Sequence, residues 1–165
     1  MEWGIFANHL LKIHMNREFK LTYEEQLNDL RWFTKRSIIL NRDNYTCRMC
    51  GNHGNEGNPL SVHHRYYLYG ALAWEYDNEV LITLCSNCHR LIHQTLSPLC
   101  YYNNGEKLIP MNFTPCDRCN GAGRFSEFEH IQGGICFKCN GLRYKELFQE
   151  KEKVIKDALE HFGMI

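Results

Sequence analysis

The residues best suited to chemistry in this 165-residue chain are its nine cysteines and nine histidines. Eight of the cysteines form CxxC pairs, and the pairs fall into two sets along the chain. The first set is Cys47, Cys50, Cys85 and Cys88, and the second is Cys116, Cys119, Cys136 and Cys139. Two CxxC pairs supply the four thiolates of a tetrahedral structural zinc site. The sequence therefore predicts two structural Zn²⁺ ions.

Redox-active pairs and disulfides remain alternative uses of these cysteines. The first residues of the chain lack the positive start, continuous apolar centre and small-residue cleavage site of a secretory signal. We therefore expect a cytoplasmic protein, bacterial or phage-encoded, whose thiols stay reduced, and this favours zinc over disulfides. Cys100 has no CxxC partner, and we expect it to be a small buried hydrophobic residue.

Four histidines lie between or directly after the pairs of the first set. His63 and His64 are adjacent and follow a short alternating pattern typical of a strand, so their side chains should point to opposite faces. His89 directly follows Cys88, and His93 comes four residues later, which places both rings on one face of a helix. Two strands followed by a helix would bring these histidines together.

Composition limits the functions that the chain can have. Lys and Arg total 19, as do Asp and Glu, so the net charge of zero excludes a globally basic nucleic-acid coat. A metal ion could supply positive charge locally. No stretch approaches the roughly 18 consecutive apolar residues of a membrane span, so we expect no membrane partner.

At this point the sequence resembles the HNH endonuclease family over about residues 36–93. The resemblance rests on "RSIILNRDNYTCRMCG", "LSVHH" and "LITLCSNCHRLIH". It implies a ββα-metal fold, also called the His-Me finger, and hydrolysis of DNA to 5′-phosphate and 3′-hydroxyl ends. It also implies that His63, His89 and His93 bind a catalytic Mg²⁺, Mn²⁺, Ni²⁺ or Zn²⁺ ion, and that His64 is the general base.

One position departs from the family pattern. The middle asparagine of the family usually lies nine residues before the metal-binding histidine, where this chain has Val80. Asn78 lies two residues earlier, and we keep it as the candidate for this role, pinning the loop through backbone hydrogen bonds. An ordinary turn asparagine after Asp77 is the alternative.

The second cysteine set has the pattern CxxCxGxG followed by CxxCxG. It resembles one zinc-binding half of the cysteine-rich domain of J-protein co-chaperones, over about 26 residues. The chaperone function does not transfer with so short a unit. Basic residues outnumber acidic ones in and after this unit, and they could contact phosphates. The alternative is a zinc staple that stabilises a tail too small to have a core.

The fold class expected is a small, zinc-stabilised α+β protein, with a ββα-metal core, flanking helices and a second zinc module. Thr22 and Glu25 form a capping box, and Leu27, Leu30 and Phe33 should continue one face of the helix that it opens. We expect strands at 60–63 and 80–84 and a helix at about 86–95. The expected units are an N-terminal helical extension (1–35), an HNH nuclease domain (36–96), a connector (97–113), a CxxCxGxG zinc module (114–141) and a C-terminal helix (142–165).

The leading hypothesis is a metal-dependent HNH endonuclease or nickase whose partner is DNA. Arg65 and Arg90 could contact phosphates beside the site. The aromatic loop at 65–79 could stack on bases, although packing as a small core is the favoured alternative. The C-terminal helix could dock on the nuclease domain or form a homodimer with a second copy. The rival hypothesis is a non-catalytic, zinc-dependent adaptor that binds nucleic acid or protein.

Overall fold

The computed structural model describes residues 21–125, 128 and 130–161, without the side chains of residues 154, 155 and 158. Most of the expected N-terminal extension (1–20) and the end of the C-terminal helix (162–165) lie outside these residues. The elements are α2 (Tyr23–Leu27), α3 (Leu30–Arg42), β1 (Leu60–His64), β2 (Tyr67–Leu68), η1 (Asn78–Val80), β3 (Leu81–Cys85), α4 (Ser86–Thr95), β4 (Cys100–Asn103), β5 (Leu108–Met111), η3 (Gln132–Gly134) and α5 (Lys145–His161).

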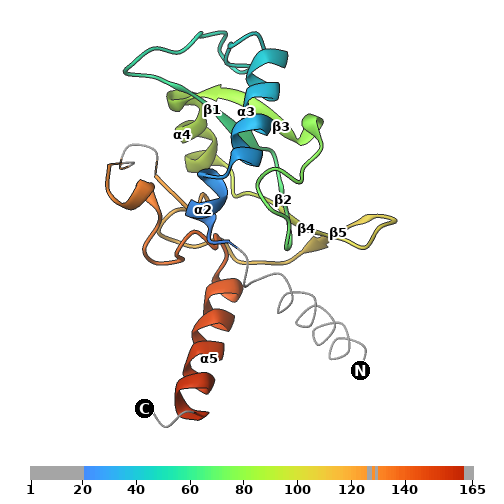
Figure 1. Ribbon diagram of the computed structural model, residues 1–165, viewed down its shortest axis with the longest axis vertical. Coiled ribbons are helices and arrows are strands. Elements are labelled where there is room, and N and C mark those ends of the chain that lie inside the picture. The colour runs from blue at the N-terminus through green and yellow to red at the C-terminus, as the bar shows by residue number, and fades with distance from the viewer. Residues whose placement is uncertain (1–20, 126–127, 129, 162–165) are drawn as a thin grey trace.

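A two-stranded sheet followed by a helix lies beside α3 in the upper part of the view in Figure 1, at the end of the molecule away from α5. Strands β1 and β3 are antiparallel, with His63 opposite Ile82 and His64 opposite Leu81. Helix α4 begins directly after β3, and α3 and α4 both contact the two strands. The expected α+β fold with a ββα core is confirmed, and the expected strands and helix match β1, β3 and α4 to within a residue or so.

The main apolar core lies between α3, β1, β3 and the loop that joins β1 to η1. Its buried residues come from all of these segments, and each strand contributes from the face that it turns inward. They are Trp32, Ile39, Leu40, Val62, Ala73, Tyr76, Val80 and Leu81.

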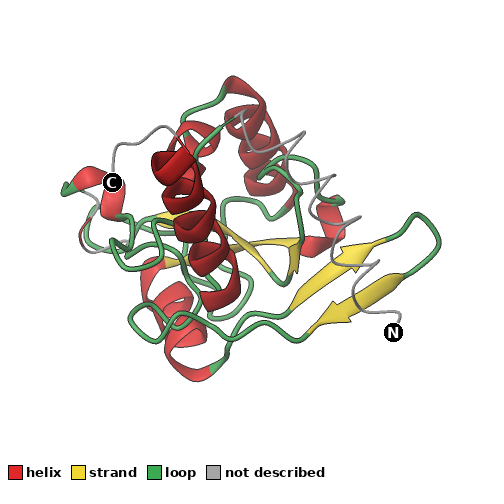
Figure 2. Cartoon of the chain, turned by 90° about the horizontal axis from the view of Figure 1, so that it is seen from below, coloured by secondary structure: helices red, strands yellow, loops and turns green. Residues whose placement is uncertain are grey.

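A second sheet occupies part of the segment expected to be a connector. Strand β4 pairs in parallel with β2 and antiparallel with β5, in the order β2-β4-β5. Figure 2 shows this second sheet, with the β4–β5 hairpin projecting from the body of the molecule. Cys100 pairs with Tyr67 in this sheet and is 6% exposed, so the expectation of a buried, hydrophobic cysteine is confirmed.

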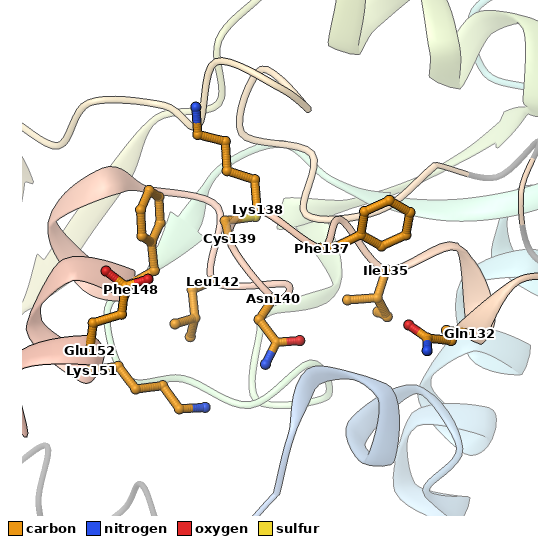
Figure 3. Close-up of a pocket in the computed structure, with 10 residues that line it drawn as sticks. All are labelled: Gln132, Ile135, Phe137, Lys138, Cys139, Asn140, Leu142, Phe148, Lys151 and Glu152. Carbon is orange, nitrogen blue, oxygen red and sulfur yellow. The ribbon is translucent and has the colours of Figure 1, made fainter. Parts of the chain in front are cut away.

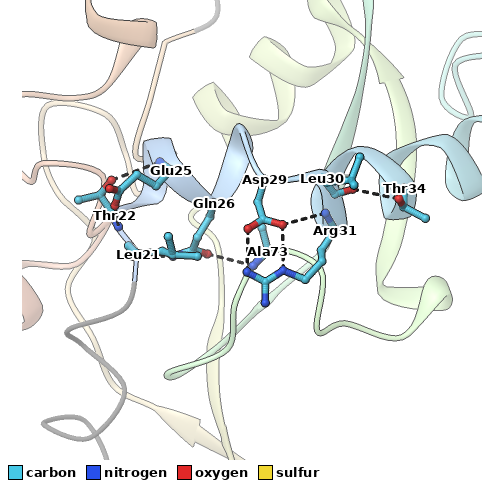
Figure 4. Close-up of polar contacts among 9 residues, drawn as sticks. All are labelled: Leu21, Thr22, Glu25, Gln26, Asp29, Leu30, Arg31, Thr34 and Ala73. Atoms are coloured by element: carbon cyan, nitrogen blue, oxygen red, sulfur yellow. Dashed lines mark hydrogen bonds and ion pairs between the residues drawn. The ribbon is translucent and has the colours of Figure 1, made fainter.

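The N-terminal helix is divided in two, unlike the single amphipathic helix that was expected. The capping box of Thr22 and Glu25 is present, but α2 ends at Leu27. Asp29 then caps α3 by accepting a hydrogen bond from the backbone of Arg31 at 2.8 Å (Figure 4). The predicted apolar face was wrong, since Leu30 is 78% exposed and Phe33 50% exposed.

The C-terminal helix projects away from the rest of the molecule (Figure 1). It begins at Lys145, whereas a start at residue 142 was expected. The difference arises because Tyr144 forms a β-bridge with Pro115 and is 2% exposed, so these residues still belong to the zinc module. In the described part of the chain, no helix is both long and apolar enough to cross a membrane.

Asp43 joins the end of α3 to β3. Its carboxylate is 5% exposed and accepts hydrogen bonds from the backbone of Thr83 and from the guanidinium of Arg42, each at 2.9 Å. Burial alone would raise the pKa of Asp43, but these hydrogen bonds outweigh it and lower the pKa below its usual value. The ionised carboxylate therefore contributes to stability.

We expect the substitution Asp43→Asn to lower the free energy of unfolding by about 2 kcal/mol at pH 7, the typical value of hydrogen bonds to a charged group. Because the folded-state pKa is lowered, this contribution is present above the unfolded-state pKa and is lost as the pH falls through the folded value. Urea denaturation at several pH values measures it. Asp77→Asn is the control, since Asp77 is exposed and makes no side-chain cap bond. Equal losses in the two variants would contradict the prediction.

Candidate metal centres and active site

The first cysteine set brings four sulfur atoms together at the start of α4. Cys47, Cys85 and Cys88 are buried and Cys50 is exposed, and the four sulfurs all lie within 4.8 Å of one another. The sulfurs of Cys50 and Cys85 are 3.7 Å apart. A disulfide requires about 2.0 Å, whereas tetrahedral zinc with bonds of about 2.3 Å gives sulfur separations of about 3.8 Å. The donor set therefore fits zinc.

This cluster fixes both strands and the helix of the core. Cys85 is the last residue of β3 and the N-terminal cap of α4. The backbone N–H of Arg48, inside the other CxxC pair, donates to the carbonyl of Thr83 at 2.9 Å. An ion here would join the 47–50 turn to the point where β3 becomes α4. It would thereby fix the backbone of the elements that carry the neighbouring histidines.

Three histidines converge beside this four-cysteine cluster. His63 comes from β1, and His89 and His93 come from adjacent turns of α4, with one ring nitrogen of each lying within 4.8 Å of the others. The Nε2 atoms of His89 and His93 are 3.3 Å apart. The ring of His63 lies edge-on to both, with centroids 5.1 and 5.0 Å away. The expected ligands of a third ion are thus brought together.

The environment keeps these three rings neutral, which is the form that binds a metal. Burial is the largest cause, and it lowers the pKa of His63 to about 2, of His89 to about 4 and of His93 to about 3. The Nδ1 atoms of His63 and His93 are buried without a hydrogen-bond partner among the described residues. Buried polar nitrogens without partners are rare in stable proteins, and a cation bound by Nδ1 of His63 would give that nitrogen a partner. His93 faces His89 through Nε2, so His93 would bind the ion through that atom.

His64 lies outside this cluster, on the opposite side of β1. Its ring is 6% exposed and stacks on Trp32, with centroids 5.4 Å apart. It also stacks on Tyr67 and meets Tyr76 edge-on. Its Nε2 lies 3.0 Å from the carbonyl oxygen of Ala73. A carbonyl only accepts, so Nε2 carries the hydrogen and Nδ1 carries the lone pair. Burial lowers the pKa of His64 to about 3.

Residues 47–95 match the family model described as HNH endonuclease. The matched stretch contains the first cysteine set and all four of the histidines described above. An HNH endonuclease domain therefore occupies this part of the chain. No curated protein and no solved structure gives a match to the sequence or fold.

The remaining site candidates of the HNH domain are not members of the three-histidine cluster. Asn78 begins η1, and its carbonyl accepts hydrogen bonds from Arg42 at 2.6 Å and from the backbone of Leu81. These contacts use only the backbone carbonyl of Asn78, which any residue type would have, so the family role of Asn78 stays a prediction. The ring of His64 donates to the carbonyl of Ala73 instead. Arg65 and Arg90 are both exposed. Arg90 donates to Asn87 at 3.1 Å.

The aromatic loop of the HNH domain is mainly a packed element. Ala73 and Tyr76 belong to the buried core, and Trp74 packs against it. The hydroxyl of Tyr76 accepts a hydrogen bond from the backbone of Leu68 at 3.0 Å. Packing was the favoured alternative for this loop, and the burial agrees with it.

The second cysteine set lies outside the HNH domain and forms a separate four-sulfur cluster. All four cysteines are buried, and the sulfurs of Cys119 and Cys139 are 3.7 Å apart. This cluster also fits structural zinc. Gly121 follows the first pair at φ +76°, and a Cβ there would lie 2.6 Å from Pro98, so the close approach of this turn to the segment that follows α4 requires glycine.

Three basic residues of this module contact other side chains. Lys138 pairs with Asp117 at 2.7 Å, and Arg118 lies over the ring of Phe137. Arg143 is enclosed between two tyrosine rings.

A pocket of about 360 Å³ lies between the module and α5 (Figure 3), away from the histidines. Its lining is Gln132, Ile135, Phe137, Lys138, Cys139, Asn140, Leu142, Phe148, Lys151 and Glu152.

Sequence reasoning missed two residues that contact the candidate site, Trp32 and Asn120, and a third, Arg143, that contacts a neighbour of His64. Trp32 stacks on His64 from α3, but one tryptophan in a helix carries no such signal. Asn120 donates to the carbonyl of His93, and Arg143 packs on Tyr67. Asn-Gly follows both CxxC pairs of the second set, and this repeat indicates the turn that presents Asn120. The repeat does not indicate which residue Asn120 contacts.

Proposed function

We propose that the protein is a metal-dependent HNH endonuclease or nickase that hydrolyses DNA phosphodiester bonds. The observation that carries this proposal is the convergence of three histidines beside a four-cysteine cluster within the HNH domain. Nuclease activity in general is what an HNH domain suggests, and the residue roles that follow are specific to the proposal.

His63, His89 and His93 would hold a divalent cation such as Mg²⁺, Mn²⁺, Ni²⁺ or Zn²⁺. Such an ion supplies positive charge to a phosphate oxygen and to the leaving 3′ oxygen. The three rings contribute by being neutral and by having fixed positions. His63 is held by its pairing in β1, and the other two by α4. Little rearrangement is then needed when the site is filled.

His64 would act as the general base through Nδ1, because Nε2 donates to Ala73. The nitrogen takes a proton from water, the water oxygen attacks phosphorus, and the bond to the 3′ oxygen breaks. Burial makes the free ring a weak base, but an anionic phosphate nearby favours its charged form and raises its pKa. Stacking on Trp32 and Tyr67 keeps the ring in one orientation.

Arg65 and Arg90 are the proposed phosphate contacts. Both side chains are exposed, and they flank the active-site segments, Arg65 directly after β1 and Arg90 directly after His89. Phosphate contacts of this kind position the duplex and carry no sequence information. We expect them to affect binding more than turnover.

The test is incubation of the purified protein with supercoiled plasmid DNA and Mg²⁺, Mn²⁺ or Ni²⁺, beside the variant His89→Ala. We expect metal-dependent nicking or linearisation by the wild type and none by the variant. Ligation of the nicks would check for 5′-phosphate and 3′-hydroxyl ends. Single-stranded RNA in a parallel arm tests the choice of DNA. Absence of cleavage above the variant with every metal would contradict the proposal.

The placement of His64 favours one second candidate, a non-catalytic adaptor with the same fold. Its ring is 6% exposed and packed against Trp32 and Tyr76, which a purely structural histidine would also show. This candidate predicts that the protein binds DNA or another protein with an affinity that His89→Ala leaves unchanged, and that no metal supports cleavage.

A further inference from the structure

The second zinc module contacts the end of α4 that carries His93. The side-chain amide Nδ2 of Asn120 donates to the backbone carbonyl of His93 at 2.7 Å. Carbonyls in the last turn of a helix have no partner within the helix, and α4 ends at Thr95. Asn120 therefore supplies the hydrogen bond that the helix cannot make at this residue.

The position of Asn120 follows from the zinc cluster. Asn120 directly follows Cys119, whose sulfur is one of the four, and it adopts a left-handed backbone conformation with φ +46°. Its Oδ1 accepts a hydrogen bond from Ser97 at 3.1 Å, which orients the amide so that Nδ2 faces α4. A single residue thus links a ligand of the second zinc to the backbone of His93.

A second contact reaches the other side of β1. Arg143 comes four residues after Cys139, and its guanidinium lies 4.1 Å from the ring centroids of Tyr23 and Tyr67. The ring of Tyr67 in turn stacks on His64. The module therefore contacts α4 at one point and a neighbour of His64 at another, so it is docked on the HNH domain from both sides of the site.

We propose that the second zinc module positions the three-histidine site, with Asn120 as the positioning residue that holds His93. Zinc bound by the second cysteine set fixes the turn, the turn presents Asn120, and Asn120 fixes the last turn of α4. The affinity of the histidines for a divalent cation then depends on a zinc ion outside the HNH domain. The inference rests on the proposed metal role of these histidines and deepens it.

The chain contains a matched control for this residue. Asn140 follows Cys139 as Asn120 follows Cys119, and each is followed by glycine. The backbone conformations are alike, with φ +49° at Asn140. The side chain of Asn140 is exposed and lines the pocket of Figure 3. Within the described part of the chain, it makes no side-chain hydrogen bond comparable to the one from Asn120 to α4.

The experiment compares Asn120→Gly with Asn140→Gly in the full chain loaded with two zinc ions. Glycine tolerates the left-handed backbone, so each variant removes only the side chain. Zinc content is measured by mass spectrometry, and Ni²⁺ binding to the third site by calorimetry. We expect Asn120→Gly to weaken Ni²⁺ binding about tenfold, the scale of lost outer contacts around metal ligands. We expect Asn140→Gly to stay within about twofold of the wild type.

Two further variants separate positioning from packing. Asn120→Asp keeps the shape and the acceptor for Ser97 but loses the donor, so we expect it to weaken Ni²⁺ binding at least as much as glycine does. Ser97→Ala removes only the bond that orients the amide, and a smaller loss of about threefold is expected. Ser97→Ala leaves the zinc-binding turn intact. If Asn120→Gly loses zinc, the Ni²⁺ affinity of Ser97→Ala therefore still tests whether Asn120 positions His93. Wild-type Ni²⁺ affinity in Asn120→Asp or in Ser97→Ala overturns the inference.

The measurement needs no DNA, so it separates this inference from the proposed function. A wild type that binds Ni²⁺ at the third site and does not cut DNA contradicts the nuclease proposal and leaves the positioning role in place. If the wild type cuts DNA and the variants Asn120→Gly and Asn120→Asp both bind Ni²⁺ as tightly as the wild type, the nuclease proposal stands and the positioning role is contradicted. A wild type that binds no third ion contradicts both.

Discussion

Replacing Cys85 with serine should unfold the HNH domain under native conditions. Cys85 is 1% exposed, ends β3 and caps α4. Its sulfur would therefore join β3 and α4 to the 47–50 turn through the metal. Structural zinc contributes about 10 kcal/mol or more to the folding of small domains, which is comparable to the whole stability of a typical domain. The change should appear as loss of one zinc per chain and loss of helical circular dichroism.

Cys100→Ser is the matched control for this prediction. Cys100 is also buried, at 6% exposed, but it belongs to neither four-cysteine cluster. We expect it to keep both zinc ions and to lower the free energy of unfolding by about 1–2 kcal/mol, the cost of placing a hydroxyl in an apolar site. A folded Cys85→Ser protein with two zinc ions would show that the first cluster does not hold the domain together.

Replacing His64 with glutamine should lower the rate of DNA cleavage about 10³-fold while leaving the binding of the third metal unchanged. The contribution of a positioned general base is typically 10² to 10⁴-fold, and the ring of His64 lies outside the three-histidine cluster. Glutamine retains an amide that can donate to Ala73, so the core should be disturbed less than by alanine. Single-turnover nicking assays and calorimetry with Ni²⁺ measure the two effects.

The control for this substitution is His53→Gln, because His53 is exposed and its side chain contacts Thr46 at 3.1 Å, away from the histidine cluster. We expect its cleavage rate to equal that of the wild type. Urea denaturation of His64→Gln then separates loss of the base from loss of packing against Trp32. An unchanged cleavage rate in a folded His64→Gln protein would rule out the general-base role.

The ββα core could be predicted from the sequence because its determinants are local. The CxxC spacing fixes tight turns, the alternating residues of 60–63 indicate a strand, and histidines four apart share a helix face. These patterns place the donors before any tertiary contact is known. The clusters of four cysteines and of three histidines in the structure agree with that prediction.

The second sheet and the break before α3 were harder to predict for physical reasons. Strand β5 contains Pro110, which has no N–H to donate and is tolerated because β5 is the edge strand of its sheet. Asp29 caps α3 in the structure, but the spacing of the apolar Leu30 and Phe33 suggested one continuous helix face beyond Leu27. Their exposure shows that apolar spacing alone does not decide which face is buried.

The contact between the second zinc module and α4 could not be predicted from local pattern. Asn120 and His93 are 27 residues apart, and nothing in either segment specifies the other. The contact depends on how the 97–113 segment folds back through β4 and β5, with the hydroxyl of Tyr144 donating to the carbonyl of Pro98 at 3.2 Å. Long-range docking of this kind follows from the packed fold and leaves no periodic signal.

The most direct test of the account is the rate of plasmid nicking as a function of Ni²⁺ or Mn²⁺ concentration, measured for the wild type and for His93→Ala with both zinc ions retained. We expect the wild-type rate to saturate at the concentration where calorimetry shows one additional ion bound per chain. We expect His93→Ala neither to bind that ion nor to nick DNA. Nicking by His93→Ala at the wild-type rate, or a wild type that binds the ion and leaves DNA intact, would contradict the account.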